Sequence, residues 1–277
     1  MVSLTYVRSL VVSTGEDPLI ARMVIRRRAA LHESCTRLRQ LHPHCPRTYG
    51  VAVLADVNKR RWFPLDSVFT LDRLRVRFYE TAAKTDPRAA ANVLAASLIH
   101  EVLGRLLPLV LLEGRAWDTG LENLWVHFDA ENDIDWVAVV DPTLRALPDD
   151  PWIRAKDGIG RAETVVVLPN ESALTTWAAH RCHRSLAPLF VWLHEACEGA
   201  MSVTAMWQLL GSTVVVAAAQ LPRRTDNAEA TNFRRSQAIL DAMVGFGLPV
   251  RGTATPPFRP KSARRPVTAS LPAGDKP

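Results

Sequence analysis

Cysteine is scarce in this chain of 277 residues: it has 4 cysteines and no CxxC pair. Disulfide-rich domains and zinc ribbons need more cysteines at close spacing, so the cysteine pattern excludes both classes. Residues 1–18 hold one basic residue and a short apolar run, which does not fit a secretory signal. We therefore expect a protein of the reducing cytoplasm.

The signatures of several common enzyme classes are missing as well. The chain has no P-loop, no GxSxG and no HExxH, so it lacks the usual markers of P-loop nucleotide hydrolases, α/β-hydrolases and zincins. Acidic residues alternate from Asp129 to Asp135 as calcium ligands do. An EF-hand loop, however, needs glycine and glutamate where this chain has Ile134 and Val140. We interpret the stretch as a hairpin turn.

Lysine is rare, with 5 lysines against 29 arginines, and the charge is unevenly spread. The net charge is +6, yet residues 22–61 carry ten basic and two acidic side chains, and residues 62–250 are acidic on balance. Arginine suits carboxylate and phosphate partners. A basic face beside an acidic body would attract an anionic ligand, nucleic acid or a membrane surface. The alternative is an ordinary solvated helix face; no nucleic-acid motif is present.

Hydrophobic periodicity predicts an α+β fold, a mainly helical domain with a small antiparallel sheet. The sheet should contain a hairpin over 122–140 and a strand over 163–168, and shorter strands are expected within 48–57 and 61–69. Helices are expected over 17–42, 71–83, 87–112 with a kink at Pro108, 170–220 with breaks at Pro188 and Gly199, and 227–245.

The chain divides into one domain and a tail. The domain covers 1–250, with 1–86 as a subdomain in an alternative division, and a disordered, basic tail rich in proline and arginine covers 251–277. Residues 200–222 carry no charge and are long enough to cross a bilayer. Their serine, threonine and glutamine residues lower the hydropathy, so we expect a buried helix at the centre of the domain and no membrane span.

Two groups of residues have the chemistry of metal ligands. His180 and His183 share one helix face, as do His194 and Cys197, and a bend at Pro188 would bring the two pairs together around zinc or iron. Buried cysteines and surface histidines are the alternative explanation.

The second group is a loop that holds His42, His44 and Cys45 between Pro43 and Pro46. Its many basic neighbours favour an edge that binds an anion over a closed zinc site. An ordinary loop that ends a helix is the alternative.

Three segments, 95–112, 121–132 and 186–220, resemble the FhuF-like ferric-siderophore reductase family, which shares its core with the C-terminal part of the IucA/IucC siderophore synthetases. In the first segment, His100, Arg105 and Pro108 fall on a polar, an arginine and a proline position of the family. In the third, Trp207 falls on the family tryptophan. The resemblance implies the α+β fold and a role in iron and siderophore metabolism.

Two departures from the family bear on the chemistry. Gln208 stands where the family usually has glycine, and the region after Arg251 lacks the four-cysteine motif that binds a [2Fe–2S] cluster. The cofactor therefore stays unknown, and reductase activity stays open. If a cluster were bound, its only cysteine ligands would be Cys35, Cys45, Cys182 and Cys197.

The sequence thus leads to a ferric-siderophore-handling protein of the iron reductase type that binds an anionic iron chelate. Arginine would hold the charge of the chelate. The ligand-binding candidates are His100, Arg105, Trp177 and Trp207. The alternative is a non-catalytic interaction or partner module of siderophore metabolism, without redox activity, that contacts another protein.

Overall fold

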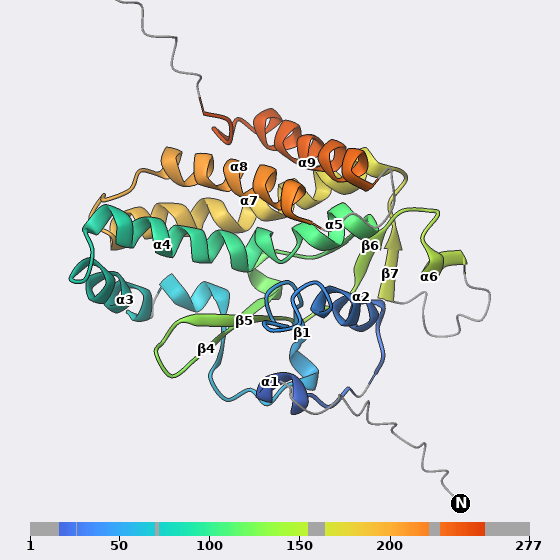
Figure 1. Ribbon diagram of the computed structural model, residues 1–277, viewed down its shortest axis with the longest axis horizontal. Coiled ribbons are helices and arrows are strands. Elements are labelled where there is room, and N and C mark those ends of the chain that lie inside the picture. Colours follow the sequence, from blue (N-terminus) through green and yellow to red (C-terminus); the bar gives the residue numbers. More distant parts are fainter. Residues whose placement is uncertain (1–16, 26, 70–71, 155–163, 222–227, 253–277) are drawn as a thin grey trace, which may run out of the picture.

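Helices and two small sheets build the fold, which is the expected mainly helical α+β class. The computed structural model describes residues 17–25, 27–69, 72–154, 164–221 and 228–252. In Figure 1, α4 runs across the middle of the molecule, with α7, α8 and α9 on one side and the sheet of β1, β4 and β5 on the other. The tail expected over 251–277 lies outside the described residues from 253 onward.

The helices follow the expected periodicity except near the N-terminus. They are α1 (Pro18–Ala21), α2 (Ala30–Arg39), α3 (Arg73–Ala82), α4 (Pro87–Ile99), α5 (Leu107–Glu113), α6 (Pro151–Arg154), α7 (Glu171–Ala196), α8 (Val203–Gln220) and α9 (Ala228–Gly245). The single helix expected over 17–42 is wrong. Asp17 caps α1 by accepting from the backbone N–H of Leu19 at 3.0 Å, but the helix lasts four residues and a new one begins at Ala30.

The central helix changes its winding before its proline. Residues His100–Gly104 form a π-helical turn between α4 and α5. Pro108 has no N–H to donate to the carbonyl of Gly104, so the regular hydrogen-bond ladder is already interrupted there. The break expected at Pro108 therefore lies about one turn earlier. Turns of the π-helix type are frequent at functional sites.

Helix α7 is continuous, which corrects the break expected at Pro188. The helix runs from Glu171 to Ala196 with Pro188 inside it, and the proline is exposed. The chain turns only after Cys197, where Glu198 and Gly199 have φ of 52° and 75°. The break at Gly199 is confirmed, because glycine adopts this left-handed backbone without strain.

The strands form two sheets, whereas a single sheet was expected. The first has the order β1 (Ala52–Val53), β5 (Ile134–Val139), β4 (Leu124–Phe128), β2 (Trp62–Pro64). The hairpin of β4 and β5 is confirmed and antiparallel, whereas β1 joins β5 in parallel. The second has the order β3 (Arg115–Trp117), β6 (Leu144–Ala146), β7 (Val165–Val167). The strand expected over 163–168 is β7, and it pairs with β6.

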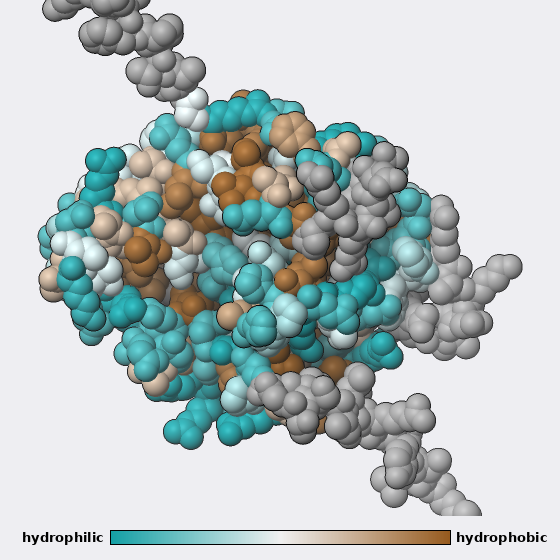
Figure 2. Space-filling view, in the orientation of Figure 1, coloured by the Kyte–Doolittle hydropathy of each residue, from teal (hydrophilic) through white to brown (hydrophobic). Residues whose placement is uncertain are grey.

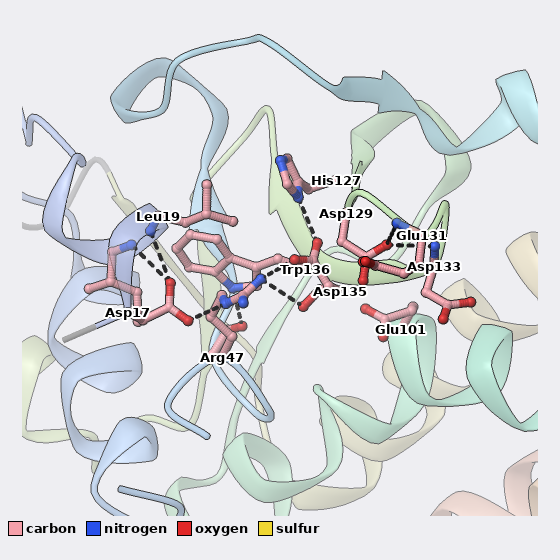
Figure 3. A network of polar contacts seen from close by, with 12 residues as sticks. Asp17, Leu19, Arg47, Glu101, His127, Asp129, Glu131, Asp133, Asp135 and Trp136 are labelled. Atoms are coloured by element: carbon pink, nitrogen blue, oxygen red, sulfur yellow. Dashed lines mark hydrogen bonds and ion pairs between the residues drawn. The ribbon is translucent and has the colours of Figure 1, made fainter. Parts of the chain in front are cut away.

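The acidic stretch between β4 and β5 is the turn expected. The Oδ1 atom of Asp129 accepts from the backbone N–H groups of Glu131 at 3.0 Å and Asp133 at 2.9 Å (Figure 3). Asn132 has φ 63°, a conformation that asparagine tolerates better than most residues. The carboxylate of Asp129 therefore serves the turn.

Each face of the first sheet packs on a different core. Side chains alternate along a strand, so Val126, Val137 and Val139 point to the main core beneath the helices. The opposite face carries a small second core in which α1 takes part, formed by Ile20, Ala52, Leu54, Trp62, Trp136 and Ala138. This second face positions the site described below.

Two helical stretches are long and apolar enough to cross a membrane by length and composition: Pro87–Glu113 and Val203–Gln220. The most apolar window of the first is 78% buried inside the protein, and that of the second is 33% buried. The central buried helix is therefore Pro87–Glu113, and the central position expected for 200–222 is wrong. Apolar side chains also reach the surface among the upper helices in Figure 2.

Candidate functional site

Three aromatic side chains form one row across the first sheet. Trp62 of β2 lies opposite His127 of β4, and His127 lies opposite Trp136 of β5. The ring centroid of Trp62 is 5.3 Å from that of His127 and 5.9 Å from that of Trp136. All three belong to the face that points away from the main core, so the imidazole and the Trp136 indole both contact the Trp62 ring at the edge of the second core.

A β-bulge places a carboxylate beside this imidazole. His127 pairs with Trp136, but the next residue, Phe128, pairs with Ile134, so Asp135 has no residue opposite it. A bulge bends the strand and redirects the side chain of its extra residue. The Oδ1 atom of Asp135 consequently lies 2.6 Å from Nδ1 of His127 (Figure 3).

The carboxylate is also held by a guanidinium. Nη1 of Arg47 donates to the second oxygen of Asp135, and Nε of Arg47 donates to Asp17 at 2.5 Å. Burial alone would raise the pKa of Asp135, but the hydrogen bonds from His127 and Arg47 outweigh it and lower that pKa. An ionised carboxylate only accepts hydrogen bonds, so Nδ1 of His127 is the donor. When the ring is neutral, its Nε2 atom carries a lone pair.

That Nε2 atom faces a cavity. The cavity has a volume of about 360 Å³ and is lined by Leu19, Arg22, Val57, Asn58, Arg60, Arg61, Trp62, His127 and Trp136. Within the described residues, every side-chain nitrogen or oxygen that is shut off from solvent has a hydrogen-bond partner. Nε2 of His127 has none, so it is open to the cavity even though the residue is only 7% exposed.

Three arginines bring positive charge to the same cavity. Arg22 follows α1, and Arg60 and Arg61 precede β2; all three are exposed. None of the three forms an ion pair with a carboxylate in the described part of the chain, whereas Arg47 and Arg105 do. Arg61 has φ 67°, an unfavourable conformation for a residue with a Cβ atom. Strained residues of this kind cluster at functional sites.

A second cavity lies on the other side of Asp135. It has a volume of about 280 Å³ and is lined by Asp17, His44, Cys45, Pro46, Arg47, Thr48, His100, Arg105 and Asp135. The loop with His44 and Cys45, expected as a binding edge, does line a cavity. Asp135 and Arg47 line this second cavity, and the hydrogen bond between Asp135 and His127 connects it to the first.

Arg105, a ligand-binding candidate from the sequence, is a buried structural group. It is 2% exposed, and its Nε atom donates to Glu101 at 2.5 Å. Its Nη atoms donate to Glu101 and to the backbone carbonyls of Arg47, Thr48, Gly50 and Asp135. Since these donors are engaged, the guanidinium fastens the loop at residues 47–50 to the central helix and has no donor left for a ligand.

His100 serves the same loop. Its Nε2 atom lies 2.9 Å from the carbonyl oxygen of Thr48, which only accepts, so Nε2 is the donor. Burial lowers the pKa of His100 and favours the neutral ring. A Cβ atom on Gly104 would lie 2.6 Å from Nδ1 of His100, which explains a glycine in this π-helical turn. His100 lines the second cavity, not the first.

Trp207 and Trp177 lie apart from both cavities. Trp207 is 4% exposed and packs edge-on against Phe190 at 4.8 Å, so it belongs to the core between α7 and α8. Trp177 is half-buried, and the guanidinium of Arg145 lies 4.6 Å above its ring. The structure does not join these tryptophans to His100 and Arg105 in one ligand site.

The expected metal site is not assembled, because α7 does not bend. His183 and His194 are eleven residues apart in one helix, roughly 16 Å along its axis. His183 stacks on Phe246, and Nδ1 of His194 lies 2.8 Å from the carbonyl oxygen of Met201. In the described ranges, no three or more His, Cys, Asp or Glu side chains are grouped to hold a metal ion. His180 and Cys197 therefore have no shared centre.

The four cysteines do not fit an iron–sulfur cluster either. Cys182 and Cys197 are fifteen residues apart along α7, roughly 22 Å, whereas the sulfurs that bind one cluster lie within a few ångströms of a common centre. Burial raises the pKa of Cys182 to about 12 and that of Cys197 to about 11, which disfavours thiolate ligands. Cys35 donates to the carbonyl of Val51 at 3.2 Å, and Cys45 is exposed. No redox step is assigned to them.

In comparisons with protein-family models and with curated proteins, no family model and no curated sequence matches the chain. The resemblance to the FhuF-like family therefore rests on the residues quoted for it. The sequence led us to expect arginine around an anionic ligand, but Arg22, Arg60 and Arg61 were not among the candidates, although they belong to its basic segment. No local signal marks it, because the pairing of β2 with β4 brings Arg60 and Arg61 to the hairpin that carries His127.

Proposed function

We propose that the protein binds an anionic iron chelate of the ferric-siderophore type in the cavity lined by Arg22, Arg60 and Arg61. One observation carries the proposal: three arginines that form no ion pair with a carboxylate among the described residues line one cavity together with two tryptophans. Guanidinium groups at the rim of a cavity that are not neutralised by carboxylates attract an anionic ligand. The resemblance to a siderophore-handling family supplies the class of anion.

The shape and chemistry of the cavity agree with such a ligand. Guanidinium groups donate paired hydrogen bonds to carboxylate and other oxygen anions. The edges of the Trp62 and Trp136 indoles, which are 4% and 1% exposed, give the cavity an apolar wall. A volume of about 360 Å³ is at the small end of pockets for organic ligands, so one arm of a chelate enters and the remainder stays outside. Such a protein works in the cytoplasm, where imported chelates are processed.

We propose that the protein binds the iron chelate, and we assign it no reduction of the iron. The resemblance implies a [2Fe–2S] cluster, and the four cysteines do not supply its ligands. The side chains that line the cavity can hold and orient a ligand, so binding is the activity that they support.

A second candidate is the non-catalytic partner module. Three valines of α7 and α8 favour it: Val191, Val215 and Val216 are 51%, 44% and 48% exposed. Exposed apolar side chains on neighbouring helices are a common feature of protein interfaces. This function would use the opposite layer of the fold, so the two candidates are compatible.

Intrinsic fluorescence tests the binding proposal, because two of the eight tryptophans floor the cavity. The protein is titrated with ferric and iron-free siderophores of the catecholate, hydroxamate and carboxylate types. Ferric chelates should quench the emission saturably, and a double variant with R60Q and R61Q should bind about ten-fold more weakly or worse. R75Q, an exposed arginine on α3, is the matched control and should bind as the wild type does. Equal binding by all three proteins would refute the proposal.

A further inference from the structure

We infer that His127, held by Asp135, is the proton acceptor for an acidic aromatic hydroxyl of the bound ligand, so that the cavity selects phenolic or catecholic molecules. The inference deepens the proposed function, since it names the chemical class of the anion. The observations that carry it are the open Nε2 atom, the ion-paired carboxylate behind the ring, and the arginines in front of it.

His127 differs from the other histidine that pairs with a carboxylate in the described ranges. Nε2 of His32 lies 2.7 Å from Asp56, and its Nδ1 accepts from the backbone N–H of Ala29 at 2.8 Å. Both nitrogens of His32 are thus used inside the protein, and its pair is structural. His127 uses one nitrogen on Asp135 and leaves the other open to the cavity.

The charges around His127 favour proton transfer to it from a ligand. On the side of β5, Asp135 stabilises an imidazolium, and Arg47 keeps Asp135 ionised. On the side of the cavity, Arg22, Arg60 and Arg61 place positive charge where the anion of the ligand would lie. A ligand that releases its proton to Nε2 therefore satisfies both sides: the new cation lies beside Asp135, and the new anion lies beside the arginines.

The transfer is balanced and needs no further reactant. The O–H bond of the ligand breaks, its electron pair stays on oxygen as a phenolate, and the proton forms an N–H bond with Nε2 of His127. An aliphatic alcohol is too weak an acid for neutral imidazole, whereas a phenol or catechol is acidic enough for the arginines to complete the transfer. Its ring also fits the apolar wall that Trp62 and Trp136 give the cavity. Catechol oxygens are ligands for ferric iron, which connects this class to the proposed function.

The probe for the test is 4-nitrocatechol, whose absorption band moves to longer wavelength when its hydroxyl ionises. It is added without iron, at a pH where the free probe is mostly protonated. With the wild-type protein the bound probe should show the band of the anion. H127Q and D135N should bind the probe with at least ten-fold less of the anionic band, and H180Q, an exposed histidine on α7, should match the wild type. Near-ultraviolet circular dichroism verifies that each variant is folded.

The outcomes separate this inference from the proposed function. A bound but neutral probe on the wild-type protein, an undiminished anionic band on H127Q, or no binding of the probe would each overturn the inference. If the probe binds as an anion through His127 while no ferric chelate quenches the tryptophans, the inference stands and the iron-chelate proposal fails. If both results are positive, the cavity binds the anion of a catechol-bearing chelate.

Discussion

Asp135 lies 2.6 Å from Nδ1 of His127 because one extra residue is accommodated in β5, where His127 pairs with Trp136 and Phe128 with Ile134. Without that bulge, the alternation along the strand would place the carboxylate and the imidazole on opposite faces. The bulge therefore produces the one feature that distinguishes this imidazole: a fixed tautomer with its free nitrogen in a cationic cavity.

Replacing Asp135 by asparagine should lower stability in a manner that depends on pH. The pKa of Asp135 is lower in the folded protein than its ordinary value near 3.9. Its ionic contribution is therefore complete above that ordinary value and is lost as the pH falls through the lower folded pKa. We expect D135N to be less stable than the wild type by about 1–3 kcal/mol at pH 6. The difference should shrink toward pH 3, measured by thermal unfolding, and a difference that grows on acidification would contradict this assignment.

Two variants of Arg61 separate the effect of its charge on binding from the effect of its backbone conformation on stability. Its φ of 67° is costly for a residue with a Cβ atom and free for glycine. R61A and R61G remove the same charge, so both should weaken chelate binding equally. R61G should nevertheless be more stable than R61A, by about 1 kcal/mol. Urea unfolding of the two variants measures this difference; equal stability would mean that the backbone of Arg61 is not strained.

The thiols should differ sharply in reactivity. Cys45 is exposed, whereas Cys35, Cys182 and Cys197 are buried, and the pKa of Cys182 is raised to about 12. Only thiolates react quickly with disulfide reagents. The native protein should therefore show one fast thiol at neutral pH, and C45S should remove it, while unfolding exposes the rest. Several fast thiols in C45S would show that the cysteines lie in more open surroundings.

Gly211 should be required for the packing of α8. A Cβ atom at this position would lie 1.8 Å from the carbonyl oxygen of Val250, a backbone atom that cannot turn aside. G211A should cost about 1–3 kcal/mol or more. Gly245 is the control, because a Cβ atom there meets nothing within 4 Å, and G245A should be neutral or stabilising by up to about 1 kcal/mol. Equal stability of the two variants would show that α8 does not approach the backbone of Val250 this closely.

The parts of the fold that depend on the residue pattern of a single segment were predicted from the sequence. The helices α3 and α9 and the hairpin of β4 and β5 have clear periodicity and clear ends, and they were predicted. The helix expected over 17–42 was wrong: α1 ends at Ala21 and α2 begins at Ala30, and Arg27 and Arg28, which interrupt the apolar face, lie in the non-helical stretch between them. Pro188 was misjudged because an exposed proline can be accommodated in a long helix that is packed on its other side.

The site was harder to predict because pairing between distant strands creates it. Trp62 and His127 become neighbours when β2 joins the edge of the hairpin, and nothing in either segment specifies that partner. The role of Arg105 was misjudged for a related reason. An arginine in a helix looks available to a ligand, but here a loop from the N-terminal region covers it and takes its donors. Residue type suggested the chemistry, and tertiary contacts decided which arginines are free.

The most direct measurement of the central claim is the affinity of one ferric catecholate chelate for the wild-type protein, the R60Q and R61Q double variant and R75Q. Calorimetry or tryptophan quenching at constant ionic strength gives the three dissociation constants. We expect saturable binding by the wild type and R75Q with equal dissociation constants, and a loss of affinity of about ten-fold or more in the double variant. Absent binding, or a double variant that binds as well as R75Q does, would contradict it.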